Sequence, residues 1–264
     1  MNTDQFFDAL WQDYLYLAPQ AQIIHDLFAR ESRVVNDHVA FRTFAQTTVE
    51  LNRLEPLLLA LGYQVQGQYR FEQKKLRARS YIHPQSGVPK IFLSELLVNE
   101  LSEGAQAILA AYTEQISDAV LDSTVFYSGR AWAMPTWAEY QALLAESEYA
   151  AWLLAIGLRA NHFTISVNHL ENYRTLQQVV QAVKEAGFAL NTVGGEIKGS
   201  SEVFLEQAST LADKQQVEFA DGDEHLIATC FYEFALRYPQ SDGALFQGFV
   251  EGNADKIFDS TNSR

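Results

Sequence analysis

Two histidines in similar surroundings are the side chains best placed to do chemistry. His38 lies in the segment "VNDHVAFRTF", residues 35–44, and His162 lies in "RANHFTISVN", residues 159–168. Both segments are typical of β-strands, in which alternate side chains share a face. We expect His38 to share its face with Ala40, Arg42 and Phe44, and His162 to share a wholly polar face with Thr164, Ser166 and Asn168.

A carboxylate in a third strand-like segment could complete a metal site. Glu233 lies in "ATCFYEFAL", residues 228–236, and an isolated carboxylate in so apolar a segment is costly to bury unless it is paired or bound to a cation. Two histidines and one carboxylate leave open positions on a divalent ion and suit non-haem Fe(II) oxygenases. A histidine at a strand start is often only structural, but the repeat-related positions of His38 and His162 favour a metal. We therefore predict that His38, His162 and Glu233 hold Fe(II), although the same ligands accept other divalent ions.

Arg42 follows His38 on the same predicted strand face, about 13 Å further along the strand. Its guanidinium could bind a carboxylate by two parallel hydrogen bonds, at one end of a substrate whose other end is anchored on the metal. An ordinary ion pair is the alternative.

The roles of three other charged residues stay open. Arg77 and Arg79 share one face of a later predicted strand, where they either line the site or are solvated. Glu95 occupies in the first half of the chain roughly the place of Glu233 in the second half. It is either a degenerate copy of that ligand or a substitute for it.

The elements that would position these residues occur twice. A strand, a helix and three strands are expected within residues 32–98, and the same order returns within residues 159–239, with the helices ending at Gly62 and Gly187. The second unit should end in one long strand that stops at Pro239. Such an internal repeat predicts two related half-barrel units with the histidines on the concave face. The expected organisation of the single domain 1–264 is a helical N-terminus (1–31), repeat unit one (32–98), a helical insertion (99–158), repeat unit two (159–239) and a C-terminal tail (240–264).

Composition excludes several classes of protein. The 264 residues include 19 basic and 33 acidic side chains, giving a net charge of −14, which disfavours nucleic acid as a partner. The single cysteine, Cys230, excludes an internal disulfide and a thiolate-rich metal site, and it falls on the apolar face of its strand. No apolar run is long enough to suggest a membrane span, and the acidic N-terminus does not resemble a signal peptide. We expect a cytoplasmic protein.

Four segments together resemble the 2-oxoadipate dioxygenase/decarboxylase family of the vicinal oxygen chelate superfamily. They are "NDHVAFRTF", "NHFTISVNH", "FYEFALRYP" and, in the tail, "GNADKIFDST". The resemblance implies an α+β, vicinal oxygen chelate-like fold of two repeated units. It also implies that His38, His162 and Glu233 are the iron ligands and that Arg42 is the catalytic, substrate-binding arginine.

The family reaction converts 2-oxoadipate and O₂ to 2-hydroxyglutarate and CO₂, a step in lysine breakdown. A small-molecule 2-oxo acid and O₂ are therefore the expected partners. The family's characterised branch has considerably longer chains, so the particular 2-oxo acid stays open, as do the product stereochemistry and the oligomeric state. The tail receives no chemical role from the sequence.

Two other functions compete with this interpretation. A non-redox, glyoxalase-like isomerase or hydrolase on the same scaffold would use a metal such as Zn²⁺ or Ni²⁺ and consume no O₂. A non-catalytic binding module would hold no metal.

Overall fold

One curved, eight-stranded sheet positions the residues singled out above. The computed structural model describes residues 1–30, 33–117 and 121–261. The strand order across the sheet is β2-β3-β4-β1-β5-β10-β7-β6. The strands are β1 (Asn36–Phe44), β2 (Gln64–Phe71), β3 (Leu76–Ile82), β4 (Lys90–Leu96), β5 (Ala160–Ser166), β6 (Lys198–Ser200), β7 (Leu205–Ser209) and β10 (Phe231–Arg237).

The sheet consists of the two predicted units joined side by side. In the first unit β1 pairs in parallel with β4, which continues antiparallel to β3 and then β2. In the second unit β5 pairs in parallel with β10, which continues antiparallel to β7 and then β6. The antiparallel pair β1–β5 joins the units. The predicted repeat and the α+β half-barrel are confirmed.

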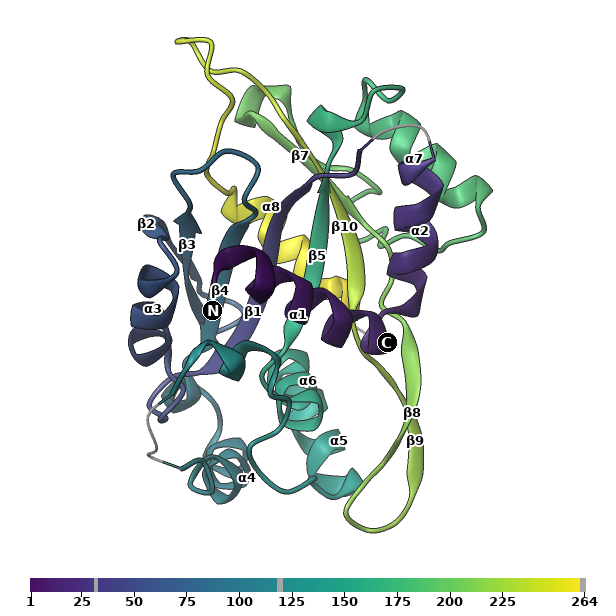
Figure 1. Cartoon of the computed structure of the whole chain (residues 1–264). Helices are drawn as coiled ribbons and strands as arrows, with labels where there is room; N and C mark the ends of the chain where they lie inside the picture. The colour runs from purple at the N-terminus through teal and green to yellow at the C-terminus, as the bar shows by residue number, and fades with distance from the viewer. Residues whose placement is uncertain (31–32, 118–120, 262–264) are drawn as a thin grey trace.

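Helices cover the convex face of this sheet (Figure 1). The crossover helices of the units are α3 (Leu51–Ala60) and α7 (Leu176–Glu185). The centre is covered by α1 (Thr3–Leu17), whose Trp11 and Tyr14 rings contact the ring of Phe163 on β5. The remaining helices are α2 (Pro19–Ala29), α4 (Glu103–Thr113), α5 (Trp137–Glu146), α6 (Glu148–Ile156) and α8 (Glu251–Ile257), with short 3-10 turns η1 (Val98–Glu100), η2 (Ser123–Tyr127), η3 (Val167–His169), η4 (Ser201–Val203) and η5 (Phe258–Thr261). Among the described residues, no helix combines the length and apolar character that crossing a membrane requires.

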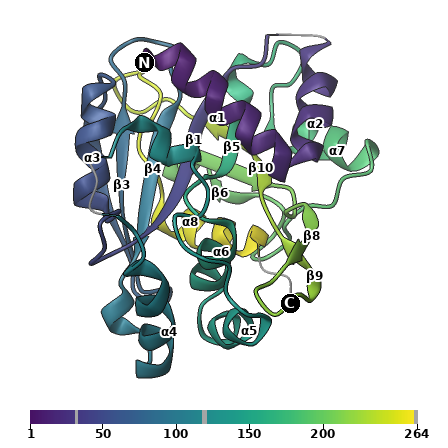
Figure 2. The same cartoon turned by 60° about the horizontal axis from the view of Figure 1, so that its bottom comes forward.

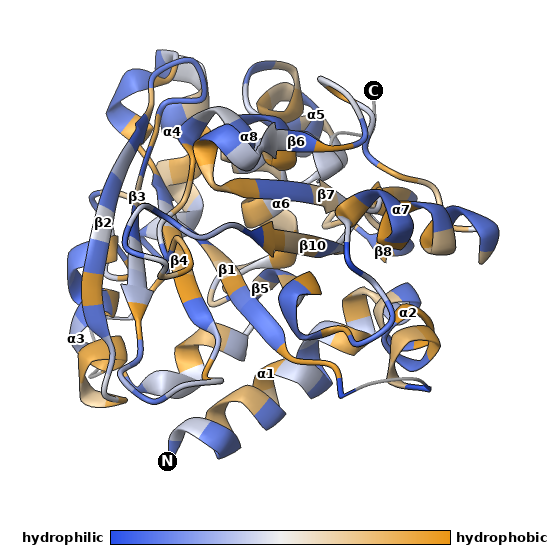
Figure 3. Ribbon diagram, turned by 90° about the horizontal axis from the view of Figure 1, so that it is seen from above, coloured by the Kyte–Doolittle hydropathy of each residue, from blue (hydrophilic) through white to orange (hydrophobic). Residues whose placement is uncertain are grey.

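The C-terminal tail fills the concave side of the sheet. Viewed from above, the sheet curves from β2 round to β6, and α8 lies between these two edges (Figure 3). Contacts of α8 with β2 at one edge and with β6 and β7 at the other agree with this view. The helices of the insertion, α4, α5 and α6, gather at one end of the half-barrel (Figure 2). The tail is therefore an integral wall of the concave space.

The expectation of one long final strand before Pro239 is wrong. The segment forms two strands, β9 (Glu224–Ala228) and β10, and β9 pairs with β8 (Lys214–Glu218) in a separate hairpin. The chain leaves one sheet and enters the other at Thr229, whose backbone N–H donates to the carbonyl of Asp213 and whose hydroxyl donates to the carbonyl of Leu17. These tertiary hydrogen bonds override the continuous β-like pattern of the sequence.

Gly157 tests how tightly the insertion packs against itself just before the strand that carries His162. It follows α6 with φ +86°, and a Cβ atom there would lie 2.2 Å from the backbone carbon of Gly129. Gly187 ends α7 with φ +92°, but no heavy atom lies within 4 Å of its Cβ position. We expect Gly187→Ala to lower the free energy of unfolding by about 1–2 kcal/mol, for the backbone conformation alone, and Gly157→Ala to lower it by more than about 3 kcal/mol. Urea denaturation of both variants measures the difference, and equal losses would contradict the close packing at Gly157.

Candidate metal centre

The structure brings His38, His162 and Glu233 together on the concave face. One candidate ligand atom from each side chain lies within 4.8 Å of the other two. Nε2 of His38 is 3.6 Å from Oε1 of Glu233, and Nε2 of His162 is 3.0 Å from Oε2. All three side chains are buried. The predicted clustering of these residues is confirmed.

Strand register explains the convergence. His38 on β1 lies opposite Thr164 on β5, and Thr164 in turn lies beside Glu233 on β10. His162 lies beside Ala40 on β1, so the two histidines occupy neighbouring strands. A shift of one residue in any of these pairings would turn a ligand to the convex face.

Each histidine is oriented from behind by the residue that precedes it. Nδ1 of His38 lies 2.8 Å from Oδ1 of Asp37, and Nδ1 of His162 lies 3.1 Å from Oδ1 of Asn161. Because both oxygens are acceptors, each Nδ1 carries the proton, and each Nε2 presents a lone pair to the centre of the cluster. Metal-binding histidines are commonly held by such hydrogen bonds.

Asp37 is fixed by a buried arginine. Nε of Arg237 donates to Oδ2 of Asp37 at 2.7 Å, and Nη2 donates to Oδ1 at 2.8 Å. Burial alone would raise the pKa of Asp37, but the guanidinium outweighs it and holds the pKa well below its ordinary value. Arg237 also donates to the carbonyls of Phe246 and Gly248 in the tail. The first histidine is thereby tied to the tail through two charged residues.

The protonation states suit metal binding. Burial lowers the pKa of His162, so its imidazole is neutral at neutral pH. Burial acts to raise the pKa of Glu233, but attraction to His38 and His162 in their protonated forms and a hydrogen bond from Gln207 bring it below its ordinary value. Neutral imidazoles and an ionised carboxylate are the forms that bind metals.

The donor atoms fit a divalent cation. Oε1 of Glu233 accepts a 2.7 Å hydrogen bond from Nε2 of Gln207, whereas Oε2 is buried without a hydrogen-bond partner in the part of the chain that the structure describes. Leaving a buried carboxylate oxygen unsatisfied is costly. Nε2 of His38 accepts only from the Thr164 hydroxyl, at 3.1 Å, a bond that a metal at the same lone pair would replace. A cation among these lone pairs would satisfy all of them.

Gln207 joins the carboxylate ligand to the tail. Its Oε1 accepts a 3.2 Å hydrogen bond from Nδ2 of Asn253 on α8, and Asn253 also donates to the carbonyl of Leu205. Phe249 packs edge-on against His38, with ring centroids 4.8 Å apart. The tail, which the sequence left without a role, therefore supports two of the three candidate ligands.

Arg42 lies deep in the protein on the same side of the sheet. Nη1 donates to Oε1 of Glu148 at 3.1 Å and Nη2 to Oγ1 of Thr261 at 2.8 Å. The guanidinium lies 4.8 Å from the ring centroids of both Tyr149 and Trp152. Arg42 is thus in an ion pair, as the alternative interpretation had it, and its binding of a substrate carboxylate stays a prediction.

Glu95 is neither a copy of Glu233 nor a substitute for it. Thr164, two residues after His162, pairs with Glu233, and Ala40, two residues after His38, pairs with Phe92. Phe92 is therefore the counterpart of Glu233 in the first unit, and Glu95 faces the other side of the sheet. There Glu95 accepts hydrogen bonds from Arg77 and from the backbone N–H of Leu51 at the start of α3.

The arginines of β3 do not line the site. Arg77 pairs with Glu95, and Arg79 donates to Glu55 on α3 at 2.8 Å. Both contacts lie on the face of the sheet that α3 covers. Phe92 of β4 lies on the opposite face, which is the face that carries the triad. Arg77 and Arg79 therefore neither form a cationic lining of the site nor are simply solvated, because each pairs with a glutamate.

Several residues of the site were missed from the sequence. They were Asp37, Asn161, Gln207, Arg237, Asn253 and Phe249. The signal for two of them was present, since each histidine directly follows an Asp or Asn. Gln207 and Asn253 carry no such signal, because their strand and helix meet the triad only in the folded chain.

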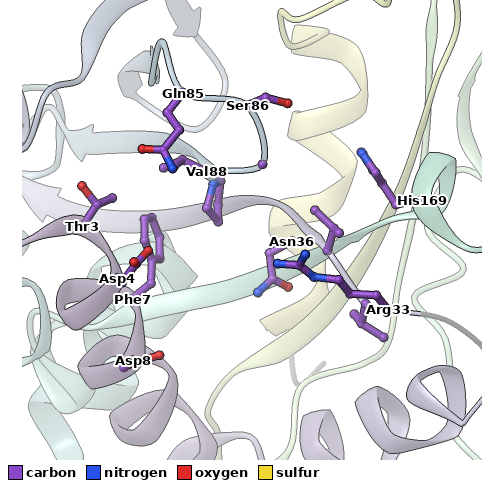
Figure 4. A pocket seen from close by; sticks show the side chains of 14 residues that line it. Thr3, Asp4, Phe7, Asp8, Arg33, Asn36, Gln85, Ser86, Val88 and His169 are labelled. Atoms are coloured by element: carbon purple, nitrogen blue, oxygen red, sulfur yellow. The ribbon is translucent and has the colours of Figure 1, made fainter.

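Two cavities differ sharply in size and in the side chains that line them. The one beside the triad has a volume of about 20 Å³, and its walls include Phe92, Phe249 and Phe258. A larger one, of about 530 Å³, lies between the start of α1, the loop after β3 and His169, and shares no lining residue with the first. Its labelled side chains, among them Asp8, Arg33 and His169, do not converge on one point (Figure 4). We therefore place the candidate site at the smaller cavity.

The fold and this site define the class of protein. Two repeated units that form a half-barrel, with metal-binding side chains on the concave face, are the architecture of the vicinal oxygen chelate superfamily. A glyoxalase superfamily protein from Ralstonia eutropha JMP134 superposes with a TM-score of 0.76 over 95% of this chain and 86% of that chain, at 22% identity. That likeness shows the shared fold.

The family within this class follows from closer relatives. The sequence matches the 2-oxoadipate dioxygenase/decarboxylase family over residues 12–128 and 124–244. It is 36% identical over 295 residues to the chloroplastic/amyloplastic 2-oxoadipate dioxygenase/decarboxylase of Oryza sativa subsp. japonica, covering 99% of this chain and 80% of that protein. The chain belongs to the 2-oxoadipate dioxygenase/decarboxylase family.

Solved structures agree with this membership. Hydroxyglutarate synthase from Oryza sativa in complex with 2-oxoadipate has a TM-score of 0.91 at 34% identity, covering 98% of this chain and 91% of that chain. A Shewanella frigidimarina protein, named as a candidate hydrolase, has a TM-score of 0.89 at 49% identity, covering 94% of this chain and 98% of that chain.

His162→Ala should abolish metal binding, whereas Glu95→Gln should not change it. The first variant removes one of three buried donors, and the second alters a carboxylate on the other face of the sheet. We expect about one divalent ion per wild-type or Glu95→Gln chain and below about 0.1 per His162→Ala chain after gel filtration, measured by elemental analysis. Full occupancy in His162→Ala would refute the assignment of the triad.

Asp37→Asn should weaken metal binding without removing a ligand. The amide keeps the size of the side chain but loses the charge that orients His38 and neutralises Arg237. We expect the metal dissociation constant to rise about 10- to 100-fold, as measured by competition with a chelator. Circular dichroism checks that the variant is folded, and an unchanged constant in folded protein would exclude a supporting role for Asp37.

Proposed function

We propose that the protein is an Fe(II)-dependent dioxygenase/decarboxylase that acts on a 2-oxo dicarboxylic acid such as 2-oxoadipate. One observation carries the proposal: three buried donors, with an unsatisfied carboxylate oxygen among them, share a concave face with a buried arginine. Family membership and the rice protein solved with 2-oxoadipate support the substrate class. The product would be 2-hydroxyglutarate, and the reaction would belong to lysine breakdown in the cytoplasm.

The ligand set supports the choice of iron. Two imidazoles and one carboxylate from His38, His162 and Glu233 are the donors typical of non-haem Fe(II) oxygenases, and they leave other positions open. Bound there, iron would supply a Lewis acid for the 2-oxo acid group and the redox chemistry for O₂.

The chain's own residues would bind and orient the substrate. Arg42 offers a charge-assisted hydrogen bond to the distal carboxylate, in a setting where Tyr149 and Trp152 keep the guanidinium away from water. Phe92, Phe249 and Phe258 surround the reacting end with apolar surface. Gln207 holds the carboxylate ligand in place by its 2.7 Å hydrogen bond. Such a site excludes water and fixes both ends of a diacid.

The overall reaction balances without a further reductant. 2-Oxoadipate plus O₂ contains the same atoms as 2-hydroxyglutarate plus CO₂. Cleavage of the bond between C1 and C2 releases C1 as CO₂ and leaves C2 as the new carboxylate, which takes one oxygen atom from O₂. The other oxygen atom becomes the new hydroxyl group on the adjacent carbon. The chain therefore needs no site for a nicotinamide or flavin.

Oxygen uptake separates this proposal from a non-redox metalloenzyme on the same scaffold. Protein loaded with Fe(II) under anaerobic conditions should consume one O₂ and release one CO₂ for each 2-oxoadipate, measured with an oxygen electrode and by CO₂ trapping. A panel of shorter and longer 2-oxo acids would identify the preferred chain length. Absence of uptake across the panel by iron-loaded protein would overturn the proposal and favour glyoxalase-like chemistry.

Arg42→Met should impair dicarboxylic substrates selectively. Methionine keeps much of the side-chain volume but cannot bind a carboxylate, so kcat/KM for 2-oxoadipate should fall about 100-fold. The value for 2-oxohexanoate, which lacks the distal carboxylate, should change far less. Arg79→Met, which removes a charge from the face under α3, serves as the matched control and should leave both values near wild type. Equal losses for both acids in Arg42→Met would show that Arg42 is only structural.

A further inference from the structure

Arg42 is not fully satisfied by its present partners. Among the described residues, each terminal nitrogen makes one hydrogen bond, to Glu148 and to Thr261, and Nε is buried with no partner. The contact with Glu148 is a single hydrogen bond of 3.1 Å, whereas a guanidinium and a carboxylate can form two in parallel. Arg42 therefore retains capacity for a second anion, or for a better-placed one.

The site as it stands is closed to a six-carbon diacid. The cavity beside the triad measures about 20 Å³, which is room for about one or two water molecules. A second cavity of about 230 Å³ lies beyond it, bounded by residues 73–75, residues 144–149, Phe258 and Asp259. Phe258 lines both cavities and lies 5.9 Å from the guanidinium of Arg42. Phe258 is the lining residue that the two cavities have in common, so it lies between the triad and the outer cavity.

Glu148 lines the wall of the outer cavity and is the more exposed partner in the ion pair. The side chain of Arg42 is 1% exposed, whereas that of Glu148 is 18% exposed. A buried guanidinium without an anion is costly, so the empty protein needs a carboxylate at this position. Glu148 can turn into the water of the outer cavity, but Arg42, between Tyr149 and Trp152, cannot reach it.

We propose that Glu148 is a place-holder for the substrate's distal carboxylate. In the absence of substrate it neutralises Arg42, and a dicarboxylic 2-oxo acid that enters past Phe258 displaces it into the outer cavity. A monocarboxylic 2-oxo acid has no group to replace Glu148 and leaves the ion pair intact. Glu148 thereby sets the affinity for diacids relative to monoacids. This inference rests on the proposed function, because it requires a dicarboxylic substrate.

The test compares two acids of equal chain length. Binding of 2-oxoadipate and of 2-oxohexanoate to Fe(II)-loaded protein would be measured by anaerobic isothermal titration calorimetry, alongside KM from oxygen uptake. Glu148→Gln should lower the dissociation constant for 2-oxoadipate about 10-fold, because a competing charge-assisted hydrogen bond is lost. The constant for 2-oxohexanoate should stay within about 2-fold of wild type, since that acid leaves the ion pair in place.

Glu146→Gln is the matched control. Glu146 lies on the same cavity wall but pairs with Lys75 at 2.9 Å and with Ser102, not with Arg42. Its loss changes the charge of the outer cavity by the same amount, and both dissociation constants should remain near wild type. An equal gain in Glu146→Gln would show a general electrostatic effect and overturn the place-holder.

Other outcomes are equally decisive. Weaker or unchanged binding of 2-oxoadipate by Glu148→Gln would mean that Glu148 orients Arg42 or only stabilises it, and would overturn the inference. Failure of the proposed function would be visible in wild type instead, as no oxygen uptake with 2-oxoadipate, and the place-holder would fall with it. Should Glu148→Gln fail to fold, Glu148→Asp, whose carboxylate is withdrawn by one methylene group, carries the same expectation.

Discussion

The structure depends on a cluster of buried electron pairs that the described residues of the chain satisfy only in part. Glu233, His38 and His162 present lone pairs to a common point, and one carboxylate oxygen there makes no hydrogen bond. Such a cluster is unfavourable in a low-dielectric interior unless a cation joins it. The surrounding residues enforce the arrangement. Asp37 and Asn161 direct the imidazoles, and Gln207 secures the carboxylate.

The repeated unit builds the curved sheet, and the difference between its two copies determines which donor atoms the site contains. Each unit contributes a histidine from its first strand, but only the second contributes a carboxylate from its last strand. The first unit has Phe92 at the corresponding register position. The candidate metal site therefore has donor atoms on three sides and apolar surface on another. The tail completes this surface with Phe249 and Phe258 and is held by Arg237 and Asn253.

The sequence predicted what depends on local periodicity. Alternation along β1, β5 and β10 placed three candidate ligands on one face, and the order of elements revealed the repeat. It failed where distant segments decide the outcome. Glu95 looked like the counterpart of Glu233 by its place along the chain, but strand register turns it toward Arg77 and α3. The break at Thr229 and the partners of Arg42 arise from contacts with residues more than a hundred positions away.

The central claim is that these three side chains hold one divalent iron. Anomalous diffraction at the iron absorption edge, from crystals grown and loaded with Fe(II) without oxygen, tests it most directly. A single strong peak within bonding distance of Nε2 of His38, Nε2 of His162 and a carboxylate oxygen of Glu233 is the predicted result. Iron at another position, or no ordered iron in crystals shown to contain it, would contradict the claim.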